Sequence, residues 1–383
     1  MQATRRRIPG THEPTAAPIR VLLFGPANEI LGGQSVQAQR LMKLLGSVAD
    51  IEMRFQAINP AFPPGFRWVK RIPFARTAMT MLCYVPQVLA RAASADILHI
   101  FTAGHYSYTM WTIPATMIGK LFGKKVIINY RDGQAQEHLR DFRSAKTTLG
   151  WADVIVGNTR FIADVFAQFG IPVRTIFNVI DPSSFTYRKR SVLRPLIMTN
   201  RILEPIYNIE CILRAFKQVL ERYPEATLTI AHVGPSGPHL QRYAAHLGLR
   251  NYRFVGKVPH DEIPRLYDEA DIYVTTPNID CMPGSLLECM ASGLPIVATE
   301  AGGIPYIVEE NVTALLVKLD DAEAVARNIC RLLEDPALVE RITGEARREV
   351  EKYRGEPVRD QWAALYRELM GRPDPTGVAE PRP

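Results

Sequence analysis

The feature that most constrains the fold is the alternation of short, apolar, β-branched runs with longer segments of helical spacing. In the first half of the chain, such runs occupy residues 19–24, 96–101, 125–129 and 153–157. Each is followed by a loop and then by apolar residues at helical intervals, as in 34–45 and 160–169. Short strands that alternate with helices indicate a parallel, doubly wound α/β sheet.

The same alternation starts again at Leu196. A helical segment at 208–223 follows, and four more strand-like runs are found at 227–231, 252–255, 271–275 and 295–298. We therefore predict an α/β protein of two Rossmann-like domains that face each other across a cleft. A length of 383 residues suits two domains of about 150 residues each.

We predict the following division of the chain, with 181–194 as a polar and basic linker. A flexible N-terminus (1–18) precedes an N-terminal Rossmann-like domain (19–185) and a C-terminal Rossmann-like domain (186–354). A last helix (355–371) packs back on the N-terminal domain, and a Pro- and Gly-rich tail (372–383) is disordered.

Charge is divided unevenly between the two halves. Residues 1–190 contain 24 Lys and Arg against 11 Asp and Glu, a balance of +13, so the rest of the chain carries −6. A basic half facing an anionic partner is one interpretation, and a chance surface composition is the other. The hydrophobic share of 47% and charged share of 22% exclude a disordered or collagen-like chain.

Cysteines and apolar runs bear on the compartment. The five cysteines are scattered without C-x-x-C spacing, which argues against a zinc ribbon or a disulfide framework. No run approaches the roughly 18 apolar residues of a membrane span, and Arg5 to Arg7 precede polar residues rather than a signal core. We expect a cytoplasmic protein, in peripheral contact with the inner face of the cell membrane.

The chemically informative stretch runs from Asp280 to Pro305. Pro283 and Gly284 open a helix there, so the free N–H groups of Gly284, Ser285 and Leu286 are expected to face the cleft as a diphosphate cradle. Asp280 precedes this helix and Glu288 lies on it. Two carboxylates beside one anion site are better used as acceptors for sugar hydroxyls; the alternative is a turn residue and a solvated helix acid.

This stretch resembles the donor-binding signature of glycosyltransferase family 4, whose members are retaining enzymes with the GT-B fold. The resemblance extends over roughly residues 19–353, with a branch-specific Asp-x-Met-Pro-x-Ser donor motif at 280–285. The other matching segments are Gly32-Gly33, Asn178-Val-Ile-Asp181-x-x-x-Phe185, Asn200-Arg-Ile-Leu-Glu204 and Gly256-Lys-Val-Pro-His260.

The resemblance implies that the N-terminal domain lies on the acceptor side and that the C-terminal domain binds a nucleotide-sugar. It also implies a role for each matching position. Gly32 and Gly33 would let the first loop approach the donor or acceptor, and Arg201 would pair with the diphosphate. Lys257 and Val258 would contact the nucleotide base through their backbone, and Glu288 would contact the ribose. Asp280 and the amides around Gly284 would hold the sugar and phosphate.

Two positions depart from the family pattern. A lysine that usually neutralises the same diphosphate is replaced by Tyr207, which brings no charge at neutral pH. The usual histidine at the end of an N-terminal strand is absent from Asn129-Tyr-Arg131-Asp132, where Arg131 and Asp132 either replace it in the cleft or pair locally. Catalysis by His99 or His105 is less expected than packing.

For the reaction, we expect metal-independent transfer of a sugar from a nucleotide-sugar to a glycan or lipid-linked acceptor, with retention and without a cofactor. No Asp-x-Asp metal motif is present, and no nucleic-acid-binding module is visible. The basic and aromatic segment 67–76 suits an anionic membrane surface, or else is a solvated loop. A sugar-nucleotide epimerase and a non-catalytic GT-B subunit remain alternatives; the base, sugar, acceptor and linkage stay open.

Overall fold

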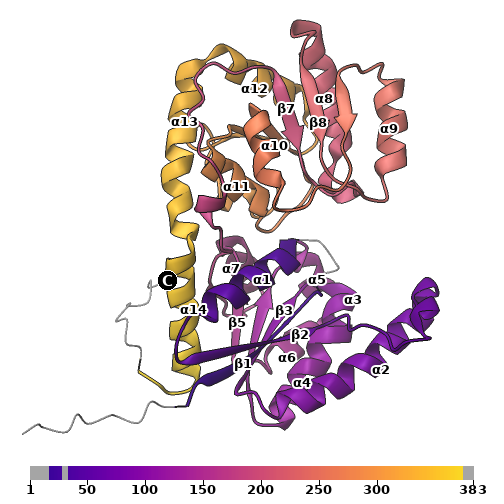
Figure 1. The fold of residues 1–383 in the computed structure, drawn as a ribbon, viewed down its shortest axis with the longest axis vertical. Helices are drawn as coiled ribbons and strands as arrows, with labels where there is room; N and C mark the ends of the chain where they lie inside the picture. Colours follow the sequence, from indigo (N-terminus) through magenta and orange to yellow (C-terminus); the bar gives the residue numbers. More distant parts are fainter. Residues whose placement is uncertain (1–16, 28–32, 374–383) are drawn as a thin grey trace, which may run out of the picture.

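The computed structural model describes residues 17–27 and 33–373 and contains two six-stranded sheets, in which all paired strands run parallel (Figure 1). The first sheet has the order β2-β1-β3-β4-β5-β6 and defines the N-terminal domain. Its strands are β1 (Ile19–Gly25), β2 (Ile51–Ala57), β3 (Ile97–Thr102), β4 (Lys125–Tyr130), β5 (Val154–Gly157) and β6 (Arg174–Thr175).

Helices cover both faces of this sheet, because its central strands are apolar on both sides and each face has to be shielded from water. The helices of at least seven residues are α1 (Gly33–Leu45), α2 (Pro73–Ala92), α4 (Ile113–Leu121), α5 (Ala135–Asp141), α6 (Arg143–Leu149) and α7 (Arg160–Ala167). Strand β2 was not predicted. It lies at the sheet edge, where Glu52 and Arg54 interrupt the apolar pattern that marks the central strands.

The second sheet has the order β12-β11-β10-β7-β8-β9 and defines the C-terminal domain. Its strands are β7 (Leu196–Thr199), β8 (Thr227–Ile230), β9 (Tyr252–Phe254), β10 (Ile272–Thr275), β11 (Ile296–Thr299) and β12 (Leu315–Val317). Its helices are α8 (Ile209–Arg222), α9 (Gly237–His246), α10 (Ile263–Glu269), α11 (Gly284–Ser292), α12 (Ala322–Glu334) and α13 (Pro336–Glu349).

The last helix, α14 (Gly355–Leu369), returns to the N-terminal domain along one side of the molecule (Figure 1). Trp362 and Tyr366 are buried there in the same cluster as β1 and α1. His99 Nδ1 lies 2.7 Å from the Tyr366 hydroxyl, and burial holds the pKa of His99 well below its usual value. The C-terminal helix is thus part of the N-terminal core.

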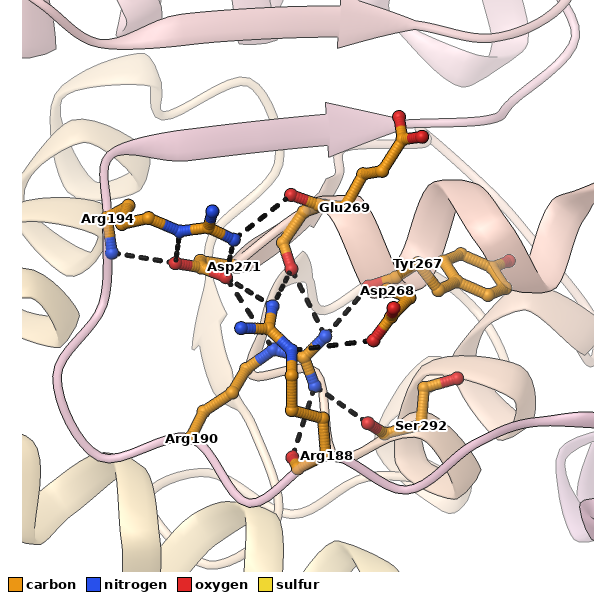
Figure 2. Close-up of polar contacts among 9 residues, drawn as sticks. Arg188, Arg190, Arg194, Tyr267, Asp268, Glu269, Asp271 and Ser292 are labelled. Carbon is orange, nitrogen blue, oxygen red and sulfur yellow. Dashed lines mark hydrogen bonds and ion pairs between the residues drawn. The ribbon is translucent and has the colours of Figure 1, made fainter.

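The segment between the sheets is fixed to the C-terminal domain by arginines gathered around Asp271, which directly precedes β10 (Figure 2). The backbone N–H and Nε of Arg194 donate to Asp271 Oδ2 at 2.7 and 2.9 Å, and Arg188 pairs with Oδ1. Arg190 is buried and donates to the Tyr267 and Ser292 carbonyls, both at 2.7 Å. The predicted linker therefore holds a defined conformation on the second sheet.

Candidate active site

A cavity of about 320 Å³ lies between the two domains. Its lining residues follow the carboxyl ends of strands in both sheets, as the topology of facing parallel sheets predicts. The N-terminal domain contributes residues from α1 and from the loops after β4 and β5. The C-terminal domain contributes the loops after β7, β9 and β10 and the beginning of α11.

Most of the predicted site residues line this cavity. Those present are Gly33, Arg131, Arg201, Tyr207, Lys257, Val258, Asp280, Gly284, Ser285 and Glu288. Gly32 lies outside the described residues. Leu286 does not line the cavity: its side chain is buried in the core and its N–H donates to the Pro283 carbonyl at 3.2 Å. The expectation of a free Leu286 amide was therefore wrong.

Arg201 and Asp280 form an ion pair at the C-terminal wall. Burial lowers the pKa of Arg201, but the charge of Asp280 outweighs it and the pKa lies above its ordinary value. The Arg201 guanidinium also lies 4.4 Å from the centre of the Tyr207 ring and 3.4 Å from Ser285 Oγ. Tyr207 thus brings a π-face to the arginine at the position where the resemblance leads us to expect a lysine.

The beginning of α11 is open toward the cavity. Pro283 is its N-cap residue, and no side chain caps the helix. A Cβ at Gly284 would have only Glu288 Oε1 within contact range, at 3.9 Å. The first amides of a helix have no intrahelical partner and the helix dipole favours an anion there, so Gly284 and Ser285 can hold a phosphate.

Glu288 is buried and holds three side-chain contacts. Its Oε2 accepts from the Tyr267 hydroxyl at 3.0 Å, while Oε1 lies 3.1 Å from His260 Nε2 and 3.4 Å from an Arg40 nitrogen. Arg40 belongs to α1, so this contact joins the two domains. Each carboxylate oxygen can accept two hydrogen bonds, so Oε2 can still accept a ribose hydroxyl, whereas a hydroxyl on Oε1 has to take the place of His260 or Arg40.

Arg131, at the end of β4, forms the opposite wall. Its guanidinium donates to the Asn178 side-chain oxygen and lies 4.3 Å from the centre of the Phe101 ring. Burial lowers the pKa of Arg131 to about 10, so the side chain remains charged at neutral pH. Asp132 does not pair with it; Asp132 accepts the backbone N–H groups of Gly104 and Gln134.

The loop that carries Asp280 is held from both sides. From the N-terminal domain, Asn158 Oδ1 lies 2.8 Å from Cys281 Sγ, and the Asn178 side-chain amide donates to the Met282 carbonyl at 3.2 Å. From the C-terminal domain, the Gly303 N–H donates to the Asp280 carbonyl at 2.9 Å. Tight contact on both faces fixes the position of the carboxylate.

The lining residues without a role predicted from the sequence include four polar ones that contact the site: Arg40, Asn158, Asn178 and His260. Asn178 and His260 lie within segments that resemble the family, so a signal was present for them. Arg40 and Asn158 had none, because their partners lie in the other domain. His99 packs in the core as expected, and His105 stacks on Phe142 with ring centres 5.6 Å apart.

Within the described residues there is neither a metal-binding cluster nor a membrane-spanning helix. In residues 17–27 and 33–373, no group of three or more His, Cys, Asp or Glu side chains is placed to hold a metal ion. Over the same ranges, none of the helices has the length and apolar character needed to cross a bilayer.

Comparison with known proteins finds a family similarity in the C-terminal domain. Residues 194–335 match the family model described as Glycosyl transferases group 1. An uncharacterized glycosyltransferase of Methanocaldococcus jannaschii is 27% identical over 283 residues, which is 68% of this chain and 70% of that protein. D-inositol 3-phosphate glycosyltransferase of Corynebacterium urealyticum is 33% identical over 181 residues, 45% of this chain and 42% of its own length.

Solved structures extend the likeness to both domains. Anabaena HepE in complex with UDP and glucose has a TM-score of 0.70 at 17% identity, covering 91% of this chain and 99% of that one. Sucrose-phosphate synthase of Thermosynechococcus elongatus has a TM-score of 0.73 at 17% identity, covering 92% and 99%. At such identities the likeness concerns the fold, and the predicted GT-B fold is confirmed.

Proposed function

We propose that this group 1 glycosyltransferase transfers a sugar from a nucleotide-sugar donor to a glycan or lipid-linked acceptor with retention, in the synthesis of a cell-surface polysaccharide. The observation that carries the proposal is the convergence of Arg201, the open beginning of α11 and Glu288 on one interdomain cavity. These groups suit a diphosphate and a ribose. HepE has been solved with UDP and with UDP-glucose, so uridine donors are the first to test.

The chemistry proceeds on one face of the sugar. The bond from C1 to the diphosphate oxygen breaks, the acceptor hydroxyl oxygen bonds to C1, and the hydroxyl proton passes to the departing diphosphate. Arg201 and the amides of α11 stabilise the negative charge that develops on the leaving group. Closure of the two domains excludes water and aligns the acceptor. Asp280, held by Arg201, accepts hydrogen bonds from the sugar rather than attacking it.

A second part of the proposal concerns the acceptor side. The segment from Met53 to Ala95 contains no Asp or Glu, and in it Arg71 and Arg76 are exposed. Trp68, Phe74 and Leu82 are 60, 91 and 69% exposed on the short helix at 67–71 and on α2. Figure 1 shows the beginning of α2 projecting from the N-terminal sheet. Exposed aromatic residues among cations suit an anionic lipid surface, which would present a lipid-linked acceptor.

Donor binding and transfer test the first part. Thermal stability should rise with one of UDP-, GDP- or ADP-sugars, since a ligand at 100 times its dissociation constant stabilises by about 2.7 kcal/mol. Arg201→Ala and Glu288→Ala should each lower transfer at least tenfold, whereas Arg222→Ala, which removes an exposed ion pair with Glu334, should not. Normal turnover in the first two variants would refute the site.

Sedimentation with vesicles tests the second part. At low salt the protein should bind vesicles containing phosphatidylglycerol and not pure phosphatidylcholine. The double variant Trp68→Ser, Phe74→Ser should reduce that binding while donor hydrolysis stays unchanged. Absence of binding to anionic vesicles would refute the membrane contact and leave the transfer reaction unaffected.

A further inference from the structure

We propose that Arg131 binds an oxyanion of the donor, so that the N-terminal domain supplies a second guanidinium across the cavity from Arg201. The oxyanion is either the diphosphate or a carboxylate of the transferred sugar. This inference rests on the proposed function, because it concerns the same cavity. If the oxyanion is the diphosphate, Arg131 is the cation that takes over the role expected of a lysine at the position of Tyr207.

Arg131 has no counter-ion within the described part of the chain. Arg190 lies 3.9 Å from Asp271, Arg367 lies 2.7 Å from Asp50, and Arg201 is paired with Asp280. Among the residues that the structure describes, no carboxylate pairs with Arg131. Its side-chain partners are the amide oxygens of Asn178 and Asn129, which are neutral, and its Nε is buried without a hydrogen-bond partner.

The Arg131 side chain is held in place by a chain of hydrogen bonds and by an aromatic ring. Tyr366 contacts His99 Nδ1, the Asn129 amide nitrogen lies 3.1 Å from His99 Nε2, and Asn129 Oδ1 faces Arg131 at 3.5 Å. Because Asn129 donates to Nε2, His99 is neutral with its proton on Nδ1, so the hydrogen bonds run in one consistent direction. Phe101 covers one face of the guanidinium.

The unpaired charge of Arg131 lowers the stability of the folded chain. A guanidinium removed from water without an anionic partner destabilises the folded chain, because the amides recover only part of the lost solvation. The remaining cavity charges do not change this balance. Asp280 and Glu288 are each paired with an arginine, Arg201 and Arg40, and Lys257 adds a further cation. The cavity therefore has a positive excess that an anionic ligand would neutralise.

The position of Arg131 limits which oxyanion it can reach. Its partner Asn178 also donates to the carbonyl of Met282, two residues before the beginning of α11. The phosphate cradle at Gly284 and Ser285 and the sugar attached to it thus lie beside this wall. The two possible sources are the leaving diphosphate and an acidic group on the sugar, as in a uronic acid.

Affinity measurements with charge variants test the proposal. The probes are the nucleoside diphosphate that stabilises the wild type most, its glucose derivative and its glucuronic acid derivative. Arg131→Met keeps the length and packing of the side chain, Arg131→Lys keeps the charge, and Arg20→Met is the control, since Arg20 pairs with Asp96 away from the cavity. We expect the affinity to fall at least tenfold in Arg131→Met and to be partly restored in Arg131→Lys. The affinity of the control should equal that of the wild type.

The pattern of losses identifies the source. A fivefold or larger loss for the diphosphate itself assigns Arg131 to the leaving group, and such a loss for the glucuronic acid derivative alone assigns it to a sugar carboxylate. Losses below fivefold for all three probes overturn the inference, and a wild type that binds no nucleotide overturns the proposed function. If Arg131→Met does not fold, Arg131→Gln replaces it. If Arg131 served only to stabilise the fold, Arg131→Met would lower the melting temperature of the unliganded protein without changing the affinity for the probes.

Discussion

The guanidinium of Arg40 lies 3.4 Å from Oε1 of Glu288, and this partly buried ion pair joins α1 of the N-terminal domain to α11 of the C-terminal domain. Arg40 also donates to the Val179 carbonyl at 3.1 Å, so the arginine is held from its own side as well. A donor whose ribose binds Oε1 of Glu288 has to compete with Arg40. The contact therefore opposes donor binding at this oxygen while it joins the two domains.

Removal of this competition should strengthen donor binding. At 3.4 Å this contact is longer than a strong charge-assisted hydrogen bond, so we expect it to contribute about 1 kcal/mol and Arg40→Met to raise the affinity for the preferred nucleoside diphosphate by about two- to fivefold. Isothermal titration calorimetry measures the change. Glu288→Gln serves as the opposite control, because it should weaken the same binding. A weaker affinity in Arg40→Met would contradict the competition and place Arg40 on the ligand.

The stacking of Tyr207 on Arg201 should matter through the ring and not through the hydroxyl. We expect Tyr207→Phe to keep kcat/KM for the donor within threefold, and Tyr207→Ala to lower it about five- to tenfold, as the loss of a desolvated cation–π contact implies. A matched control is Tyr187→Ala, whose ring carries Arg347 at 5.5 Å outside the cavity and whose loss should leave kcat/KM unchanged. Equal losses in Tyr207→Phe and Tyr207→Ala would speak against the ring as the active feature.

Among the acidic residues of the C-terminal domain, Asp271 should be the one whose substitution lowers stability most. Asp271→Asn leaves the buried Arg190 and its neighbours without their anion, which should cost about 3 to 5 kcal/mol, or roughly 6 to 12 °C in the thermal midpoint at pH 7. Asp268→Asn is the control, since its carboxylate is exposed and meets Arg188 at 3.6 Å. A loss no larger than that of the control would contradict the role of the cluster.

The same variant has a defined pH dependence. Burial raises the pKa of Asp271, but the hydrogen bonds from Arg194 and Arg188 outweigh it, so the folded pKa lies below the ordinary value. The unfolded chain binds the proton first, so the stabilisation is complete above about pH 5 and is lost as the pH falls through the unfolded pKa of about 4 and then through the lower folded pKa. The difference in midpoint between wild type and Asp271→Asn should therefore shrink between pH 5 and pH 3. A difference that stays constant would show that the effect is not ionic.

The sequence pattern predicted both sheets because nearly all central strands are apolar on both faces, and that signal is local. It missed β2, where Glu52 and Arg54 are tolerated at an edge, and the short strands β6 and β12, which have two and three residues. Strand order could not be predicted in the same way. It depends on crossover connections between segments far apart in the chain, such as the pairing of β10 with β7.

The same distinction holds for the site: residues within a local motif could be predicted, and residues that act between the domains could not. Asp280, Ser285 and Glu288 lie within one short motif and line the same cavity, while Arg201 entered through the family resemblance. Arg40 and Asn158 act across the domain interface, on residues 248 and 123 positions away. No local pattern marks such contacts, because they depend on how two separately folded sheets are placed.

The last prediction concerns the glycine that supports the Asp280 loop. A Cβ at Gly303 would lie 1.9 Å from the Cys281 carbonyl oxygen, so Gly303→Ala must displace backbone rather than a flexible side chain. We expect kcat/KM to fall at least tenfold, because a displacement of about 1 Å at a reacting centre can lower the rate by two orders of magnitude. Gly344→Ala on α13 is the control: no atom lies within 4 Å of its added Cβ, and the better helix former should raise stability by about 0.5 to 1 kcal/mol. Full activity in Gly303→Ala would mean that the loop can move without losing the geometry of Asp280.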